Sequence, residues 1–284
     1  WRATIAVNPG SWMAHNNLGI IHLHRGEIER AQAEFTKALE IDPAYAEAHY
    51  NLGNALVRSG AASEAIGEYK RAIELNPRIV GAHANLGKIL MQSGRLAEAV
   101  ESLQRAVAIA PDNPAVRGAL GGALARSGRS REGVVHLQAA AERDQHSADL
   151  RNDLGNALLD LGRNEEAIRS FREALQMEPG NAEAHYGLGN ALLDTQRLEE
   201  AAASYRRAVD LRPDYPPARN NLANVLVQLG RVDEGIAEYR AALSARPNYA
   251  AAHKNLANAL RRAGRLDEAM HHSEIASELE ARAR

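Results

Sequence analysis

A leucine followed by glycine or alanine recurs along this chain at an interval that never changes. The leucines are spaced 34 residues apart, and they are Leu18, Leu52, Leu86, Leu120, Leu154, Leu188, Leu222 and Leu256. Counting each repeat from six residues before its leucine divides residues 12–283 into eight repeats, without insertion or deletion. A constant period of this length is typical of a solenoid, in which each repeat packs on its neighbours. The chain length therefore counts modules and does not predict one compact core.

The residues at fixed positions of the repeat predict that each one is a pair of helices. Positions 8 and 20 hold only glycine or alanine, and position 27 is alanine in all eight repeats. Small residues at such spacings let two helices approach closely. Position 24 carries the bulky partner, which is Phe35, Tyr69, Leu103, Leu137, Phe171, Tyr205, Tyr239 and, in the last repeat, Ser273.

Glycine and proline mark where the two helices end. Position 15 is glycine in seven repeats and Gln196 in the sixth, and glycine there can adopt the left-handed conformation that ends a helix. Position 32 is proline in six repeats, where it stops the second helix. Between these marks, apolar residues recur at spacings of three and four, the period of a helix. The predicted fold class is all-α, an α-solenoid of helix–turn–helix repeats.

The composition agrees with close-packed helices and argues against some classes of partner. Two Trp, two Phe and eight Tyr are few for a chain that is 45% hydrophobic, which favours helices over sheets. The 34 basic and 36 acidic side chains give a formal net charge of −2, which argues against a nucleic-acid partner. No apolar run approaches the roughly 18 residues that suggest a membrane span. The absence of cysteine excludes disulfide and thiolate sites.

Motifs that carry chemistry are missing. No nucleophile elbow, phosphate loop or zinc-protease motif occurs, so the sequence predicts neither an enzyme nor a cofactor. Five of the 11 histidines recur at position 4, and these are His15, His49, His83, His185 and His253. Because a column spaced by one repeat does not converge on a point, we expect these rings to lie in the core and to bind no metal.

The pattern of leucine–glycine at positions 7 and 8, alanine at 20 and 27, an aromatic residue at 24 and proline at 32 resembles the tetratricopeptide repeat. One departure is consistent, since position 4, a tryptophan in that family, is histidine or arginine here. The resemblance implies a right-handed superhelix with repeats at residues 12–45, 46–79, 80–113, 114–147 (degenerate), 148–181, 182–215, 216–249 and 250–283. Residues 1–11 follow the same register, so we expect the second-helix remnant of a preceding repeat.

The resemblance also implies that the first helices line a concave groove, faced by positions 2, 5, 6, 9, 12 and 13. Candidate peptide-binding residues at these positions are Asn17, Asn51, Asn54, Asn85, Asn152, Asn156, Asn190, Asn221, Asn224, Asn255, Asn258, Tyr50, Tyr186, Lys88 and Asp153. A side-chain amide both donates and accepts hydrogen bonds, so a column of asparagines can hold an extended peptide backbone. The alternative is that these amides satisfy polar groups of the repeats themselves.

Charge along the predicted groove changes sign. Repeats 2–4 contribute Arg58, Lys88 and Arg126 against Glu47, whereas repeats 5 and 6 contribute Asp149, Asp153, Asp160, Glu183 and Asp194. We expect the acidic stretch to favour a protein partner with a basic segment facing repeats 5 and 6. The alternative is a solvated face of mixed charge. Lys254 and Asn258 match only the opening pair of the family's carboxylate clamp for chaperone tails, so a chaperone adaptor is not predicted.

Three functions follow from these patterns. The leading one is a protein–protein interaction scaffold that binds an extended or helical peptide segment in its groove. The second rests on residues 1–19, which resemble the junction before repeats in bacterial membrane proteins. The chain would then be the soluble acceptor-selecting or regulatory tail of a glycosyltransferase-like enzyme, cytoplasmic or, if tethered, periplasmic. The third is self-assembly as a homo-oligomer, since neither end of the solenoid carries an obvious polar cap.

Overall fold

The computed structural model describes residues 1–282, apart from the side chains of residues 2 and 5, and over these residues it contains seventeen helices and no strand. The predicted all-α class is therefore confirmed. Ala283, the last residue of the eighth predicted repeat, lies outside the described residues. No helix of the described chain is long and apolar enough to cross a membrane.

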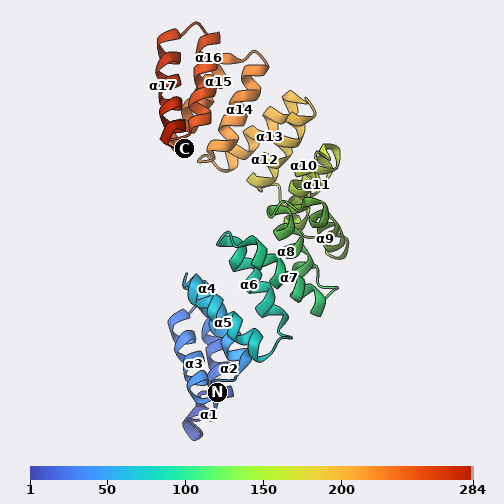
Figure 1. Ribbon diagram of the computed structural model, residues 1–284, viewed down its shortest axis with the longest axis vertical. Helices are drawn as coiled ribbons and strands as arrows, with labels where there is room; N and C mark the ends of the chain where they lie inside the picture. The colour runs from blue at the N-terminus through green and yellow to red at the C-terminus, as the bar shows by residue number, and fades with distance from the viewer. Residues whose placement is uncertain (283–284) are drawn as a thin grey trace. The chain divides into compact units, whose positions relative to one another are not determined.

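The helices fall into two compact blocks, coloured from blue to red along the chain in Figure 1. The N-terminal block, residues 1–143, contains α1 (Arg2–Val7), α2 (Trp12–His24), α3 (Ile28–Ile41), α4 (Ala46–Arg58), α5 (Ala62–Leu75), α6 (Val80–Gln92), α7 (Leu96–Ile109), α8 (Pro114–Arg126) and α9 (Ser130–Arg143). The C-terminal block begins at Asp144 and contains α10 (Ala148–Asp160), α11 (Asn164–Met177), α12 (Ala182–Asp194), α13 (Leu198–Leu211), α14 (Pro216–Gln228), α15 (Val232–Ala245), α16 (Ala250–Arg262) and α17 (Leu266–Arg282).

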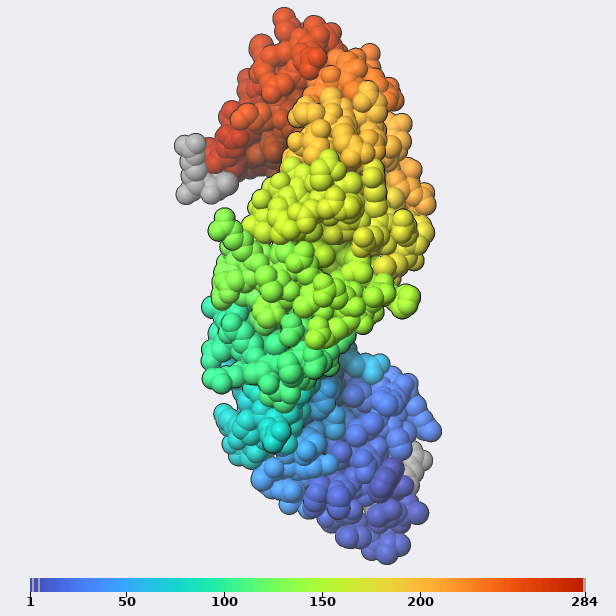
Figure 2. All heavy atoms as spheres, turned by 90° about the vertical axis from the view of Figure 1, so that its right-hand side faces the viewer, coloured from blue at the N-terminus to red at the C-terminus, as the bar shows by residue number. Residues whose placement is uncertain are grey.

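Within each block the even-numbered helices are the first helices of the repeats and the odd-numbered ones the second helices. Each first helix packs against the second helix of its own repeat, and α4, α6, α8, α12, α14 and α16 also pack against the second helix of the preceding repeat in the same block. Side chains fill the spaces between neighbouring helices of a block, as the space-filling view shows (Figure 2).

The turn between the two helices depends on a left-handed residue. All seven position-15 glycines have positive φ, from +70° at Gly162 to +84° at Gly60. Gln196, which replaces glycine in the sixth repeat, has φ 60°. A residue with a Cβ is strained there. The register of the repeat, set by the other seven glycines, therefore imposes the turn on a residue that does not favour it.

The small residue at position 8 makes room for the bulky residue at position 24. A Cβ added at Gly53 would lie 2.7 Å from the ring of Tyr69, and one at Gly155 would lie 2.7 Å from the ring of Phe171. Both rings are 1% exposed or less. In the first six repeats, one ring or leucine at position 24 thus packs directly on the backbone of the first helix, which explains why so few aromatic residues suffice.

Paired charges mark the start of the second helices. An arginine at position 16 binds a glutamate at position 19 with two hydrogen bonds of 2.6–2.8 Å in six repeats: Arg95–Glu98, Arg129–Glu132, Arg163–Glu166, Arg197–Glu200, Arg231–Glu234 and Arg265–Glu268. A carboxylate in the first turn also complements the helix dipole.

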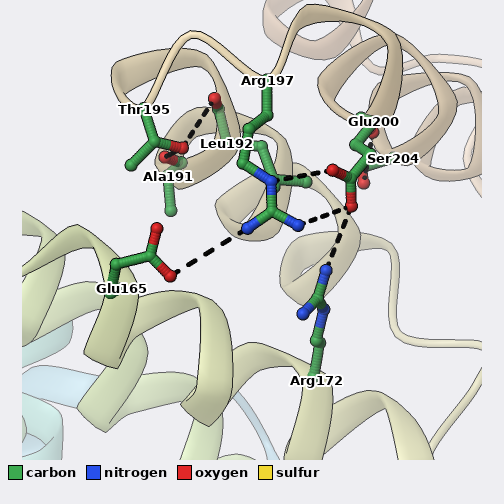
Figure 3. Close-up of polar contacts among 8 residues, drawn as sticks. All are labelled: Glu165, Arg172, Ala191, Leu192, Thr195, Arg197, Glu200 and Ser204. Atoms are coloured by element: carbon green, nitrogen blue, oxygen red, sulfur yellow. Dashed lines mark hydrogen bonds and ion pairs between the residues drawn. The ribbon is translucent and has the colours of Figure 1, made fainter.

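In the C-terminal block these pairs extend from one repeat to the next. Figure 3 shows Glu200 held by Arg197 of its own repeat and, at 3.1 Å, by Arg172 of the preceding repeat. The hydrogen bonds from Arg197, with the charges of both guanidinium groups, keep the pKa of Glu200 below its ordinary value. Arg240 bridges to Glu268 in the same way at 2.6 Å.

Candidate functional site

The candidate residues lie on the face that the first helices form in each block, which we call the first-helix face. They belong to α2, α4, α6 and α8 in one block and to α10, α12, α14 and α16 in the other. The side-chain amides of the candidate asparagines differ in their hydrogen bonding. Most of them are hydrogen bonded between or within repeats.

In the N-terminal block, Asn54 joins two repeats. Its Oδ1 accepts a hydrogen bond from the Tyr69 hydroxyl at 2.8 Å and another from Asn85 Nδ2 at 2.8 Å. Burial raises the pKa of the Tyr69 phenol, which therefore stays protonated and donates. Asn51 donates from Nδ2 to Oδ1 of Asn16, a buried residue of the preceding repeat, at 3.0 Å.

The same arrangement recurs in the C-terminal block. Oδ1 of Asn190 accepts from the Tyr205 hydroxyl at 2.7 Å and from Asn221 Nδ2 at 3.1 Å. The remaining bonded asparagines of this block follow: Asn224 accepts from Tyr239, Asn255 donates to Asn220, and Asn258 accepts from Arg261. Tyrosine at position 24 thus always meets asparagine at position 9 of its own repeat.

Five of the predicted residues make no hydrogen bond or ion pair within the described chain, and Asn152 and Tyr50 are two of them. The other three are Asn17, Asn156 and Lys88, of which Asn156 and Lys88 are exposed. Asp153 is also exposed. Asn152 differs from the prediction, because it is only 8% exposed and its Oδ1 is buried without a partner in the described structure. The side chain of Asn152, at position 5, is therefore largely buried between helices.

The two tyrosines at position 5 are packed between repeats. The Tyr50 hydroxyl would lie 2.6 Å from a Cβ at Gly81 of the next repeat, and the Tyr50 ring lies 6.2 Å from that of Tyr69. The Tyr186 ring lies 5.9 Å from that of Tyr205 and 5.2 Å from that of Tyr215. Both tyrosines are half-buried, so their rings mainly pack between neighbouring repeats and expose little surface to a partner.

A hollow in the first-helix face lies between α4 and α6. It has a volume of about 320 Å³ and is lined by Asn54, Val57, Arg58, Tyr69, Asn85, Lys88, Ile89 and Gln92. Arg58 Nη1 donates to the Leu23 carbonyl of the preceding repeat at 2.5 Å. Lys88 is consequently the cation of this hollow that has no partner in the described structure.

The acidic stretch of repeats 5 and 6 is partly compensated. Glu183 forms an ion pair with Arg212 at 3.2 Å, and Arg212 also stacks on Tyr215. Burial, with the charge of Glu183 among the smaller causes, raises the pKa of Tyr215 to about 12. Asp149 and Asp194 are exposed, so this face of the C-terminal block still presents negative charge.

The position-4 column is structural, and it has a partner that the sequence analysis missed. In seven of the eight repeats the position-4 side chain donates to the carbonyl of the preceding position-32 proline, as His15 Nε2 does to that of Pro9 at 3.2 Å. In repeats 1, 2 and 8 the other ring nitrogen of the histidine contacts position 23, as His15 Nδ1 does with Glu34 at 2.6 Å. Pairing of positions 4 and 23 across repeats would have been a usable signal. No group of three metal-ligating side chains occurs among the described residues.

Known proteins resemble this chain along most of its length. A family model described as tetratricopeptide repeat matches residues 50–114, 152–216 and 220–272, more than half of the chain. Two further repeat models of the same kind match residues 19–60 and residues 90–152 and 196–238. No curated protein matches the sequence at a significant level.

Solved structures show the same fold. YrrB, described as a TPR protein with an unusual peptide-binding site, is 26% identical, with a TM-score of 0.55 over 65% of this chain and 95% of its own. The APC/C hetero-tetramer Cut9–Hcn1 is 21% identical, with a TM-score of 0.65 over 79% of this chain and 45% of that one. MamA (41-end) from Desulfovibrio magneticus RS-1 is 22% identical, with a TM-score of 0.56 over 60% and 96%. None of these proteins is described as a glycosyltransferase, so they do not support that alternative.

Proposed function

The chain belongs to the tetratricopeptide repeat family, and from this premise we propose that its first-helix face binds an extended segment of a partner protein. Membership of the family and the shared fold make the chain a protein-interaction scaffold in general terms. The peptide-binding site of YrrB belongs to YrrB, but it is a precedent for peptide binding on this fold. No catalytic role is proposed.

One observation carries the proposal. Asn54 and Asn85 are fixed in place by their bonds, yet each amide keeps hydrogen-bonding capacity. Oδ1 of Asn54 accepts two bonds while its Nδ2 hydrogens have no acceptor in the described structure, and Oδ1 of Asn85 has no donor there. Both groups line the hollow that contains Lys88. A donor and an acceptor held in fixed positions suit a peptide backbone, because little entropy is lost when it binds.

The C-terminal block repeats this arrangement with Asn190, Asn221 and Tyr205. Its exposed carboxylates, Asp149 and Asp194, favour a partner segment with lysine or arginine in this block. We therefore propose that the basic part of the partner lies over repeats 5 and 6. Added salt should weaken binding there mainly by slowing association.

The test uses peptides selected from a randomised display library on the intact chain. Lys88→Glu should weaken a peptide bound in the N-terminal block at least about tenfold, since a charged hydrogen bond is lost and a repulsion added. Asn156→Ala should weaken one bound in the C-terminal block by about threefold to tenfold. Neither side chain has an internal partner, so the fold should be unaffected.

Matched controls lie on the second helices. Arg131→Glu, an exposed site on α9, makes the same change of charge as Lys88→Glu and should leave the dissociation constant unchanged. Asn51, Asn85 and Asn221 are poor targets, because alanine there also removes hydrogen bonds between or within repeats. Equal effects of Lys88→Glu and Arg131→Glu would contradict binding on the first-helix face.

A second candidate function is self-association through the N-terminal end. Val7 is 88% exposed, and Met13 and Trp1 are each 53% exposed. Apolar side chains gathered at one end of a helical array can pack against a second copy. The molar mass from light scattering should then rise with concentration and fall back in Met13→Glu. A strict monomer at about millimolar concentration, well above a weak dissociation constant, would exclude this candidate.

A further inference from the structure

In the first two repeats, the histidine at position 4 contacts a glutamate carboxylate from its own repeat. Nδ1 of His15 lies 2.6 Å from Glu34 Oε2, and the other oxygen of Glu34 accepts from Lys37 at 3.1 Å. His49 and Glu68 make the same contact at 2.6 Å. The carboxylate comes from position 23, and the cation in the first repeat comes from position 26.

The third repeat keeps the histidine but lacks the carboxylate. His83 Nε2 binds the Pro77 carbonyl at 3.0 Å, as His15 Nε2 binds that of Pro9, so the ring has the same orientation. Position 23 is Ser102, whose hydroxyl donates to the His83 backbone carbonyl at 2.9 Å. His83 is 7% exposed, and its Nδ1 makes no hydrogen bond with any described residue. Nδ1 of His83 therefore lacks the carboxylate partner that the equivalent atoms of His15 and His49 have.

A cavity occupies the place of the missing carboxylate. It has a volume of about 390 Å³, lies between the second helices α5 and α7, and has His83, Leu86 and Leu90 of α6 among its lining residues. The volume of this cavity is large enough for a carboxylate group, because a single water molecule occupies only about 30 Å³. The cavity lies within the N-terminal block and is separate from the hollow that contains Lys88.

The charges around the cavity favour an anion. Three acidic residues line it, but Glu74 is paired with Arg71 and Glu98 with Arg95. Lys70 and Arg105 also line it, and neither forms an ion pair within 4.0 Å in the described chain. Two cations thus face one unpaired carboxylate, that of Glu101. Arg105 occupies position 26, the position from which Lys37 binds Glu34 in the first repeat.

We propose that this cavity binds a glutamate side chain presented by a partner protein, with its carboxylate between His83 Nδ1 and the Arg105 guanidinium. The chain places a glutamate carboxylate against the equivalent histidine in repeats 1 and 2, which is why the proposed ligand is glutamate. The site lies on the second helices, so it does not depend on the first-helix face.

Binding takes up a proton. His83 Nε2–H is already donated to Pro77, so Nδ1 carries a hydrogen only in the imidazolium form. The other groups that line the cavity are Lys70 and Glu74 on α5 and Glu98, Glu101 and Arg105 on α7. Groups of these types do not ordinarily titrate between about pH 6 and pH 8. Affinity should therefore rise as the pH falls, by up to about tenfold per pH unit.

The experiment titrates the full chain, with ¹⁵N-labelled histidine, with the peptide acetyl-Gly-Glu-Gly-amide. The imidazole nitrogens of His83 should shift, and acetyl-Gly-Gln-Gly-amide should not shift them. Glutarate forms a second arm that separates a peptide side chain from a free small carboxylate. A response to glutarate alone would overturn the proposed partner, and equal responses to the Glu and Gln peptides would overturn the carboxylate site.

Three variants test the geometry. Ser102→Glu restores the residue of repeats 1 and 2, so it should fill the cavity and abolish the shift. Ser102→Ala keeps the cavity empty and should retain binding, while Arg105→Ala should weaken it about tenfold or more. Undiminished binding by Ser102→Glu would overturn the proposal. If that variant does not fold, the Arg105→Ala and pH arms decide, and an unchanged dissociation constant in both would overturn it.

Discussion

At the residue scale, the repeat depends on positions where the structure leaves no room for a Cβ atom. Gly53 is at position 8 against the ring of Tyr69, whereas Gly67 lies in α5 with nothing within 4 Å of an added Cβ. The sequence predicts small residues at position 8 because all eight repeats agree there. It names position 24 as the bulky partner but does not reveal which of the small positions, 8, 20 or 27, packs on it, because that contact depends on how the two helices cross.

Substitution of these two glycines should have opposite effects. Gly53→Ala forces the Tyr69 ring to move and should lower the free energy of unfolding by about 2 kcal/mol. Gly67→Ala should raise it by up to about 1 kcal/mol, because alanine is the better helix former. Thermal unfolding of both variants checks the pair. A Gly53→Ala variant as stable as the parent would mean that the two helices of the repeat are less closely packed at this position than in the structure.

Gln196 offers a gain in stability. It holds φ 60° at a turn where the seven other repeats have glycine. Gln196→Gly should raise the free energy of unfolding by about 1 kcal/mol, because the strain of a left-handed residue with a Cβ is removed. Gln104→Gly, in the middle of α7, is the control and should lower it by a similar amount. A lower melting temperature for Gln196→Gly would contradict the strained turn.

At the element scale, neighbouring helices are joined by polar contacts that a single repeat cannot show. The bond between Asn54 and Asn85 joins residues 31 apart, and that between Arg172 and Glu200 joins residues 28 apart. Periodicity predicts the helices but not the register of one repeat on the next. The pairing of Tyr69 with Asn54 is different, since tyrosine at position 24 occurs only together with asparagine at position 9.

The last repeat should be sensitive to acid. Nδ1 of His272 lies 2.9 Å from Nδ1 of His253, whose Nε2 binds the Pro247 carbonyl. Burial, together with the charges of His253 and His271, lowers the pKa of His272. The folded state therefore favours neutral His272, and its stability is fully present above the unfolded pKa of about 6.5 and is lost as the pH falls below it.

Amide hydrogen exchange measures this loss where it occurs. Protection in α17 should fall between about pH 7.5 and pH 5.5, after correction for intrinsic rates, while α13 serves as the internal reference. His272→Glu should retain protection at the lower pH, because a carboxylate pairs with protonated His253 as Glu34 pairs with His15. Equal losses in the variant and the parent would contradict the histidine pair as the cause.

The two blocks should also differ in their response to salt. Glu200 is held by arginines of two repeats, whereas Glu98 is bound by Arg95 alone. Glu200→Gln should therefore lower the melting temperature more than Glu98→Gln at low ionic strength. The difference should vanish near about 0.5 M NaCl, since these carboxylates are exposed and screened. A difference that persists at high salt would point to packing as the cause.

At the scale of the whole molecule, the period alone predicts the fold class, because the two helices of each repeat lie within one 34-residue unit. The site was less predictable. Lys88 and Asn156 are exposed, while Asn152 is buried and most of the other asparagines bond to neighbouring side chains. The contacts between repeats decide which amides keep unpaired hydrogen-bond donors and acceptors. These contacts are seen only in the three-dimensional structure.

The central claim is that the first-helix face binds the partner segment. A library-selected peptide carrying a photoreactive benzophenone would be cross-linked to the intact chain and the attachment sites read by mass spectrometry. The account predicts attachment to even-numbered first helices, chiefly α4 and α6 in the N-terminal block or α10 and α12 in the C-terminal block, and its loss in Lys88→Glu or Asn156→Ala respectively. Attachment mainly to the odd-numbered second helices, unaffected by either variant, would contradict it.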